Sequence, residues 1–159
     1  MAKKDSFLKE EAFNLLKTLE EDCSPKWGIM SAQHMVEHLG LLLAIAIEKI
    51  RPQPFASESA MQKFYQYLIV DDRPFTKNFS PKGMPEITMP LRYESLDLAI
   101  EKLQSMVDSF YRFFEEDPDE ETLHPMLGEL SFVDWEKFHI KHFKHHFAQF
   151  DLMETNVTI

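Results

Sequence analysis

Residues 135–149 read WEKFHIKHFKHHFAQ, a stretch that predicts an α-helix with a chemical site on it. Four of the seven histidines of the chain lie inside this segment, within the eight residues 139–146. An α-helix turns by about 100° per residue, so residues four apart, such as His142 and His146, lie on one face. This face can therefore offer two imidazole nitrogens to a single metal ion.

A second histidine pair with the same spacing, His34 and His38, lies on an earlier segment that also predicts a helix. A third ligand can come from this pair. We favour His38, because it is deeper in its helix and precedes the apolar run 39–47. His34 lies three residues past Ser31, the predicted N-cap, where side chains are more often in contact with water. The residues predict a metal site made of His38, His142 and His146, with His34 as a rival.

Two further histidines, His139 and His145, are expected beside the ligands or on the surface, with one of them as an alternative ligand. Three neutral imidazoles leave positions open on a metal ion, which is typical of catalytic rather than structural sites. Zinc, nickel, iron, manganese and cobalt all suit imidazole ligands. Because no ligand is anionic, the ion would keep its full charge and lower the pKa of a bound water or thiol.

Apolar residues recur at helical spacing in four main segments, and the chain holds only four glycines, fewer than an all-β protein normally needs. We therefore predict an all-α four-helix bundle, as one domain over residues 1–159. A long crossover with several prolines joins the second and third main helices, and a further helix is expected within it. The expected main helices cover residues 6–21, 31–50, 95–116 and 131–150, and the additional one covers residues 57–70.

The formal net charge of −10 at pH 7 disfavours binding to nucleic acid, which needs a basic surface. The longest apolar run, residues 39–47, is too short to cross a membrane, and no secretory signal is visible. Cys23 is the single cysteine, which excludes an internal disulfide framework and fits a reducing compartment. These features predict a cytoplasmic protein that binds neither nucleic acid nor membranes.

Three separated motifs resemble the DinB-like superfamily, and in particular a bacterial subgroup carried as a domain of unknown function. They are residues 27–39 (WGIMSAQHMVEHL), 124–130 (HPMLGEL) and 142–150 (HFKHHFAQF). The resemblance covers nearly the whole chain and implies a four-helix bundle with a three-histidine metal site. By position, the implied ligands are His38, His142 and His146. Some relatives have a histidine where Gln149 stands, which leaves His145 as the main rival.

The resemblance also implies an activity, because the superfamily includes a maleylpyruvate isomerase and metal-dependent transferases that use bacillithiol, mycothiol or glutathione. We accordingly expect a metal-dependent enzyme that transfers a low-molecular-weight thiol to a small electrophilic substrate, with zinc or nickel as the first choice of metal. Two alternatives stay open. The first is a noncatalytic bundle that binds a metal or small ligand, and the second is a metal-dependent hydrolase.

Other expectations concern the surroundings of the site. His124 precedes Pro125 in a loop, where it is either a proton donor facing the pocket or an exposed loop histidine. Gln149 is expected to orient a ligand histidine by a hydrogen bond. Residues 75–90 are expected to form a wall of the pocket. Acidic, aromatic helix bundles often pair, so we also expect a homodimer.

Overall fold

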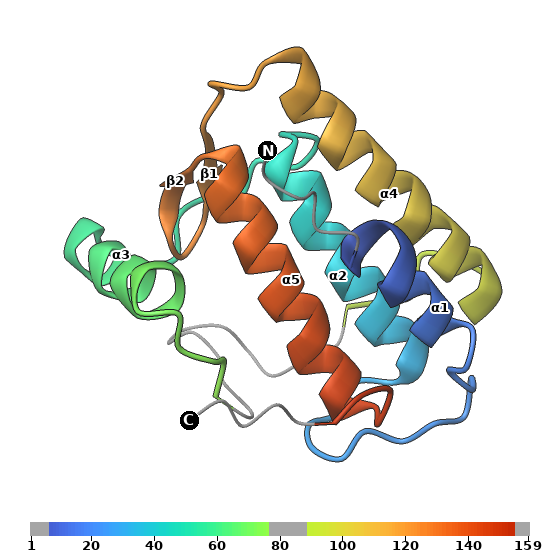
Figure 1. The fold of residues 1–159 in the computed structure, drawn as a ribbon. Helices are drawn as coiled ribbons and strands as arrows, with labels where there is room; N and C mark the ends of the chain where they lie inside the picture. Colours follow the sequence, from blue (N-terminus) through green and yellow to red (C-terminus); the bar gives the residue numbers. More distant parts are fainter. Residues whose placement is uncertain (1–6, 77–88, 155–159) are drawn as a thin grey trace.

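The computed structural model describes residues 7–76 and 89–154 of the chain (Figure 1). Its α-helices are α1 (Ala12–Leu16), α2 (Ala32–Ala46), α3 (Glu58–Tyr65), α4 (Leu96–Glu116) and α5 (Phe132–Gln149). Two π-helical segments, η1 (Phe7–Glu11) and η2 (Gln66–Val70), continue into α1 and extend α3, respectively. Two short strands, β1 (Thr122–His124) and β2 (Gly128–Leu130), complete the described elements.

The prediction of an all-α four-helix bundle is wrong. The described residues contain five α-helices and a two-stranded antiparallel sheet, in which Thr122 pairs with Leu130 and His124 with Gly128. The hairpin forms because Gly128 adopts a φ of 88°, which a glycine reaches without steric cost. Each strand is three residues long, too short for an alternating pattern to be recognised.

Hydrogen bonds fix the hairpin to the helices. The Thr122 hydroxyl donates to the Ala46 carbonyl at the end of α2 (2.7 Å). The same hydroxyl accepts the indole N–H of Trp135 on α5 (2.7 Å). Both bonds are buried, where each polar group needs a partner. The hairpin is therefore an integral part of the fold.

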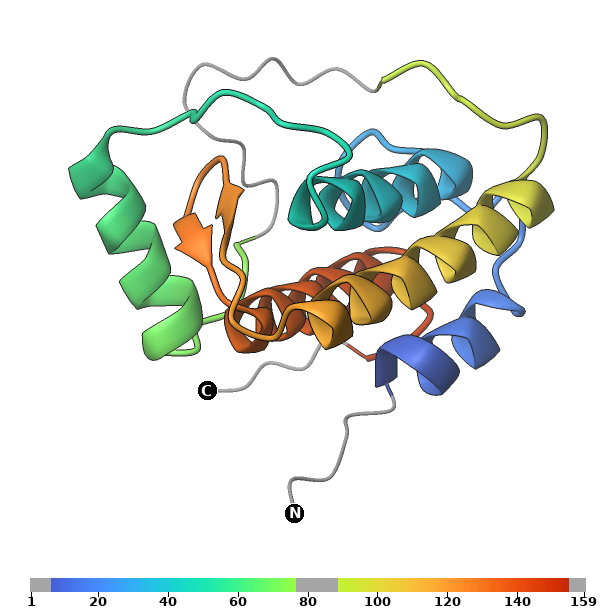
Figure 2. The same cartoon turned by 90° about the horizontal axis from the view of Figure 1, so that it is seen from above.

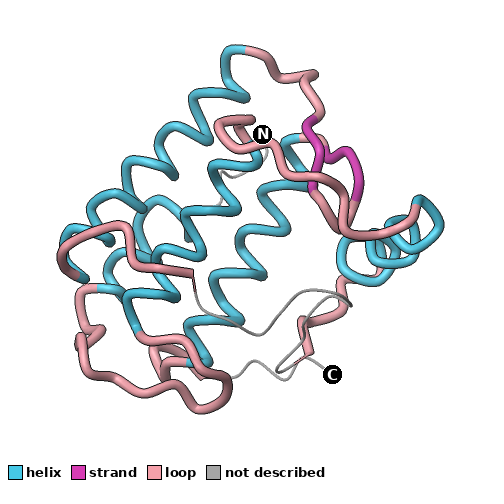
Figure 3. The backbone as a smooth tube through the Cα atoms, turned by 180° about the vertical axis from the view of Figure 1, so that it is seen from behind, coloured by secondary structure: helices cyan, strands magenta, loops and turns pink. Residues whose placement is uncertain are grey.

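Helices α1, α2, α4 and α5 lie together, and α3 with η2 stands on the other side of α5 (Figures 1 and 2). Helix α2 packs along α4 and also contacts α5, while η2 contacts α5 and α3 contacts β2. The view from behind shows the hairpin between α3 and the ends of the longer helices (Figure 3). This arrangement brings α2 and α5, the two helices that carry the histidine pairs, side by side.

The N-termini of the helices follow the sequence closely. The side chains of Ser31, Ser95 and Ser131 each accept a hydrogen bond from a backbone N–H in the first turn of α2, α4 and α5. These bonds satisfy donors that have no partner within a helix. As a result, α4 and α5 begin and end within one residue of the predicted bounds, and α3 with η2 occupies residues 58–70.

Two helix ends differ from the prediction. Helix α1 ends at Leu16 rather than near residue 21, and Leu19 bonds back to Leu16 in a tighter turn. Helix α2 ends at Ala46 rather than near residue 50, because Glu48 takes a φ of 62° and reverses the chain. A non-glycine residue in this conformation is uncommon, so no pattern in the sequence indicates that the helix ends here. The expected start of the first helix at Ser6 lies outside the described residues.

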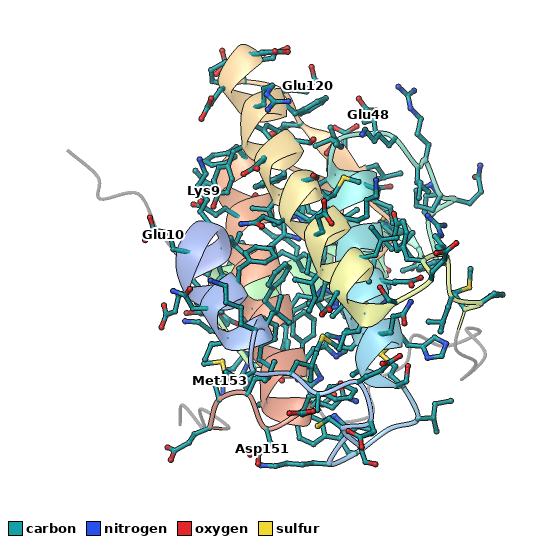
Figure 4. All side chains as sticks on the ribbon, turned by 90° about the vertical axis from the view of Figure 1, so that its right-hand side faces the viewer. Lys9, Glu10, Glu48, Glu120, Asp151 and Met153 are labelled. Carbon is teal, nitrogen blue, oxygen red and sulfur yellow. The ribbon has the colours of Figure 1, made fainter. Side chains whose placement is uncertain are left out.

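The core is rich in aromatic side chains that fill the space between the helices. Phe110 of α4 and Trp135, Phe143 and Phe147 of α5 each have no exposed surface. Figure 4 shows aromatic rings between the ribbons, while labelled charged groups such as Lys9, Glu48 and Asp151 point outward. Within residues 7–76 and 89–154, no helix combines the length and apolar character needed to cross a membrane.

Candidate metal centre

Three histidines from two helices converge at the contact between α2 and α5. His38 comes from α2, and His142 and His146 come from consecutive turns of α5. The Nε2 atom of His142 lies 2.9 Å from Nε2 of His38 and 3.2 Å from Nε2 of His146. The ligand nitrogens of all three lie within 4.8 Å of one another. Nitrogen ligands about 2.0–2.1 Å from one ion lie roughly 2.9–3.4 Å apart, so the two close separations fit shared coordination.

Burial keeps the three rings neutral. His142 is 5% and His146 8% exposed, and His38 is half-buried. Desolvation lowers the pKa of His38 to about 4 and that of His146 to about 3, and it takes the pKa of His142 well below its usual range. Neighbouring histidines lower these pKa values further, since a second positive charge would be repelled. Neutral imidazole is the form that binds metals.

A hydrogen bond to Gln149 sets the orientation of His146. The Gln149 Nε2 group donates to the Trp27 carbonyl (2.7 Å), so its Oε1 atom faces Nδ1 of His146 at 2.6 Å. An amide oxygen only accepts, so Nδ1 of His146 is the donor and carries the proton. The lone pair of His146 is consequently on Nε2, the atom that faces His142. The predicted hydrogen bond between Gln149 and a histidine is present, while the role of His146 as a metal ligand stays a prediction.

Aromatic rings enclose one side of the cluster. Phe138, one turn before His142, stacks on it with ring centroids 5.2 Å apart. Phe75 follows η2 in the chain, and its ring centroid lies 5.8 Å from that of His142 and 5.5 Å from that of His145. Phe75 thus contributes to the predicted wall, whereas residues 77–88 of that segment lie outside the described residues. Sequence reasoning missed Phe138, although its four-residue spacing from His142 places it on the same helix face.

The rival ligand His34 has another role. Its backbone N–H donates to the Ser31 hydroxyl (3.1 Å), and its Nδ1 lies 2.6 Å from the same oxygen. Nδ1 of His34 also accepts the Ser31 backbone N–H at 3.4 Å. The two residues form a capping box that completes the start of α2. His34 is therefore not among the histidines that converge.

The other rival, His145, lies at the edge of the cluster. Its ring centroid is 5.1 Å from that of His146 and 5.6 Å from that of Trp27. His145 is half-buried and does not belong to the group of nitrogens within 4.8 Å. It remains close enough for its charge to lower the pKa of His38, His142 and His146.

His139 lies wholly inside the protein, away from the converging nitrogens. Its ring stacks on Trp135 (5.2 Å between centroids) and meets Phe110 edge-on (4.8 Å). Both ring nitrogens are buried without a hydrogen-bond partner among the described residues. Burial accordingly takes the pKa of His139 well below its usual range.

His124 is buried as well, with 3% of its surface exposed. Its Nδ1 accepts the backbone N–H groups of Met126 (3.0 Å) and Leu127 (3.2 Å), which shapes the hairpin turn. Its ring contacts Trp135 and Phe138, and desolvation lowers its pKa to about 3. Phe138 contacts both His124 and His142. The structure thus gives His124 a place in the hairpin and does not bring it to the three histidines.

The single cysteine, Cys23, is half-buried on the loop after α1. Its thiol lies 3.6 Å from the carbonyl of Phe150 and 3.7 Å from that of Ser24. The weak bond to Phe150 helps to join the loop to the end of α5.

The family model described as "Protein of unknown function (DUF1569)" matches residues 7–153, which include every described helix and strand. No curated protein and no solved structure matches the chain significantly.

Proposed function

The chain belongs to the DUF1569 family, and we propose that His38, His142 and His146 hold one divalent metal ion for an enzymatic reaction. The observation that carries the proposal is the convergence of their three ligand nitrogens within 4.8 Å. Because these histidines come from α2 and α5, which are about a hundred residues apart in the chain, their meeting requires the tertiary fold.

The chemistry of the donor set supports a metal. Three neutral nitrogen donors face one another, and His146 is held by Gln149 with its lone pair directed at the cluster. The buried Nδ1 of His142 has no partner among the described residues, which leaves Nε2 as the atom through which this ring interacts. Zinc and nickel are the metals we favour, and iron, manganese and cobalt also suit such ligands.

The reaction we propose is the transfer of a low-molecular-weight thiol to a small electrophile. The ion would supply Lewis-acid activation, which favours the deprotonated thiol near neutral pH. The protein's own residues position and shield the site: Gln149 orients His146, and Phe138 and Phe75 cover one side of His142 with apolar surface. Bacillithiol, mycothiol and glutathione are the thiols to test, as in enzymes of the DinB-like superfamily, to which we propose that this protein is related.

Hydrolysis is a weaker proposal because, among the described residues, no carboxylate joins the three histidines to act as a general base. No carboxylate among the described residues shifts the pKa of His38, His142 or His146. A hydrolase normally holds an acidic or basic side chain within hydrogen-bond reach of the attacking water. Thiol transfer does not need one, since the thiol proton passes to solvent.

We test the activity with the metal-loaded protein, chlorodinitrobenzene and each of the three thiols in turn. In this reaction the thiolate sulfur bonds to the ring carbon, chloride leaves with its bonding electrons, and the thiol proton goes to solvent. The expected result is conjugation above the uncatalysed rate that disappears in His142→Ala. A protein that retains its metal but conjugates none of the thiols would instead favour the noncatalytic metal-binding module.

We also propose that the protein is a homodimer in the cytoplasm. Large apolar side chains at the surface support pairing, among them Val133 of α5 (70% exposed) and Val70 of η2 (55% exposed). The single half-buried cysteine fits a reducing compartment. Light scattering should give twice the chain mass for the wild-type protein and the chain mass for Val133→Lys. An unchanged mass in the variant would exclude this surface as the interface.

A further inference from the structure

A cavity lies beside the histidine cluster. It has a volume of about 400 Å³ and is lined by Lys63, Phe64, Tyr67, Leu68, Phe75 and Thr76. This volume is within the range of pockets that hold small organic molecules. The four lining residues of α3 and η2 are spaced as neighbours on one helical face, so this face presents a largely aromatic and aliphatic surface.

Phe75 is the wall that the cavity shares with the metal centre. It lines the cavity, and its ring also contacts His142, His145 and Phe138 at centroid distances of 5.8, 5.5 and 5.8 Å. A molecule bound against Phe75 would therefore be separated from His142 by this one aromatic ring. No other residue that lines the cavity has a ring contact with His142 among the described residues.

The walls of the cavity are fixed to α5. Lys141 donates hydrogen bonds to the carbonyls of Leu68 (2.8 Å) and Arg73, and Lys137 donates to that of Ile69 (2.6 Å). The Tyr67 hydroxyl donates to the carbonyl of Pro74 (3.2 Å). These bonds hold η2 and the chain that leads to Phe75 in place. The described part of the cavity is consequently formed before a ligand binds.

The charge at the cavity favours an anion. Lys63 is the one charged residue among those that line it, and it forms no ion pair with any residue in the described ranges. Of the two acidic groups on the nearby turn, Asp72 pairs with Lys141 (3.2 Å), and Asp71 accepts a hydrogen bond from the neutral amide of Gln66 (3.0 Å). Lys63 is thus an available cation at the edge of an apolar cavity.

We propose that this cavity binds the electrophilic substrate, a flat aromatic molecule that carries one carboxylate. The aromatic body packs against Phe64, Tyr67 and Phe75, and the carboxylate pairs with Lys63. The inference rests on the proposed function, because the adjoining metal centre would act on the bound molecule. Binding itself does not require the metal, so the two proposals can fail separately.

The test compares cinnamate with cinnamyl alcohol, which has the same aromatic body without the charge. Calorimetry should show tighter binding of cinnamate to the wild-type protein, by about threefold, as expected for an exposed ion pair. Lys63→Gln should remove this preference, while Lys102→Gln, which changes an exposed lysine of α4, should keep it. Equal affinity for both probes, or an equal loss in both variants, would overturn the role of Lys63.

Phe75→Ala should weaken both probes by about tenfold, because it removes the shared aromatic wall. The matched control is Phe55→Ala, which truncates another loop phenylalanine that does not line the cavity and should leave both affinities unchanged. Similar affinities in these two variants, or no binding of either probe to the wild-type protein, would overturn the proposed site.

His142→Ala should retain cinnamate binding within about twofold. If this variant retains cinnamate binding and the wild-type protein contains no metal, the result supports the proposed binding cavity and contradicts the proposed metal centre.

Discussion

His146 and Gln149 form a hydrogen bond in which Nδ1 of the ring lies 2.6 Å from the amide oxygen. This bond fixes the proton of His146 on Nδ1 and leaves Nε2 free to act as a ligand. Because Gln149 also bonds to the Trp27 carbonyl, the loop before α2 and the last turn of α5 jointly determine the ring's orientation.

Gln149→Leu should weaken metal binding by about 10- to 100-fold, the usual effect of losing the partner that orients a ligand histidine. Competition with a chromophoric chelator measures the affinity. The control is Gln33→Leu, which removes another buried glutamine whose amide bonds to Glu37 and Tyr93 rather than to a histidine. Equal affinities in the two variants would contradict the orienting role.

His34→Ala should leave the metal content unchanged and reduce the free energy of unfolding by about 1 kcal/mol. The loss is expected because His34 and Ser31 form the capping box of α2. Urea denaturation measures the stability, and elemental analysis measures the metal. Loss of metal in this variant would show that His34 is a ligand and that the ring rotates away from Ser31 on binding.

His139→Phe should leave stability unchanged or increase the free energy of unfolding by about 1 kcal/mol, because two unpartnered buried nitrogens are removed. The phenyl ring can keep the contacts with Phe110 and Trp135. The same substitution at His124 should instead destabilise the protein by about 1–3 kcal/mol, since two backbone N–H groups lose their acceptor. Strong destabilisation by His139→Phe would show that an ordered water bonds to His139.

The pH dependence of stability provides a separate test of the buried His124. Its pKa is lowered from 6.5 to about 3 in the folded protein, so between these values only the unfolded chain binds a proton there. Stability therefore falls as the pH is lowered through this window, by up to about 1.4 kcal/mol per unit for this one group. His124→Asn keeps an acceptor for the turn. In the metal-free protein, it should reduce the slope of the free energy of unfolding against pH by the amount that corresponds to about one proton. An unchanged slope would contradict the burial of His124 as a neutral ring.

Much of the helical structure could be predicted, because caps and apolar spacing are local signals. Ser31 and Ser131 marked the starts of α2 and α5, and the apolar face of α4 fixed its length. The hairpin could not be predicted, since its pairing depends on Gly128 and on the bond from Thr122 to Ala46, seventy-six residues away in sequence. The end of α2 depends in the same way on an unusual conformation of Glu48.

For the site as well, the spacing of residues within one helix could be predicted, whereas the contacts between distant segments could not. The spacing of His142 and His146 was visible in the sequence, and so was the pair His34 and His38 on the other helix. Which member of that pair faces α5 depends on helix packing, and the structure shows that His38 does so while His34 bonds to Ser31. Phe75 approaches His142 across sixty-seven residues of chain. The sequence predicted a wall over residues 75–90, but no pattern indicated that Phe75 is the residue that contacts His142.

The most direct test is elemental analysis of the protein, purified without a chelator or a histidine tag, beside four alanine variants. We predict about one divalent ion per chain in the wild-type protein and in His34→Ala, and its loss in His38→Ala, His142→Ala and His146→Ala with the helical circular dichroism retained. No metal in the wild-type protein after reconstitution, or metal retained in His142→Ala, would contradict the proposed centre.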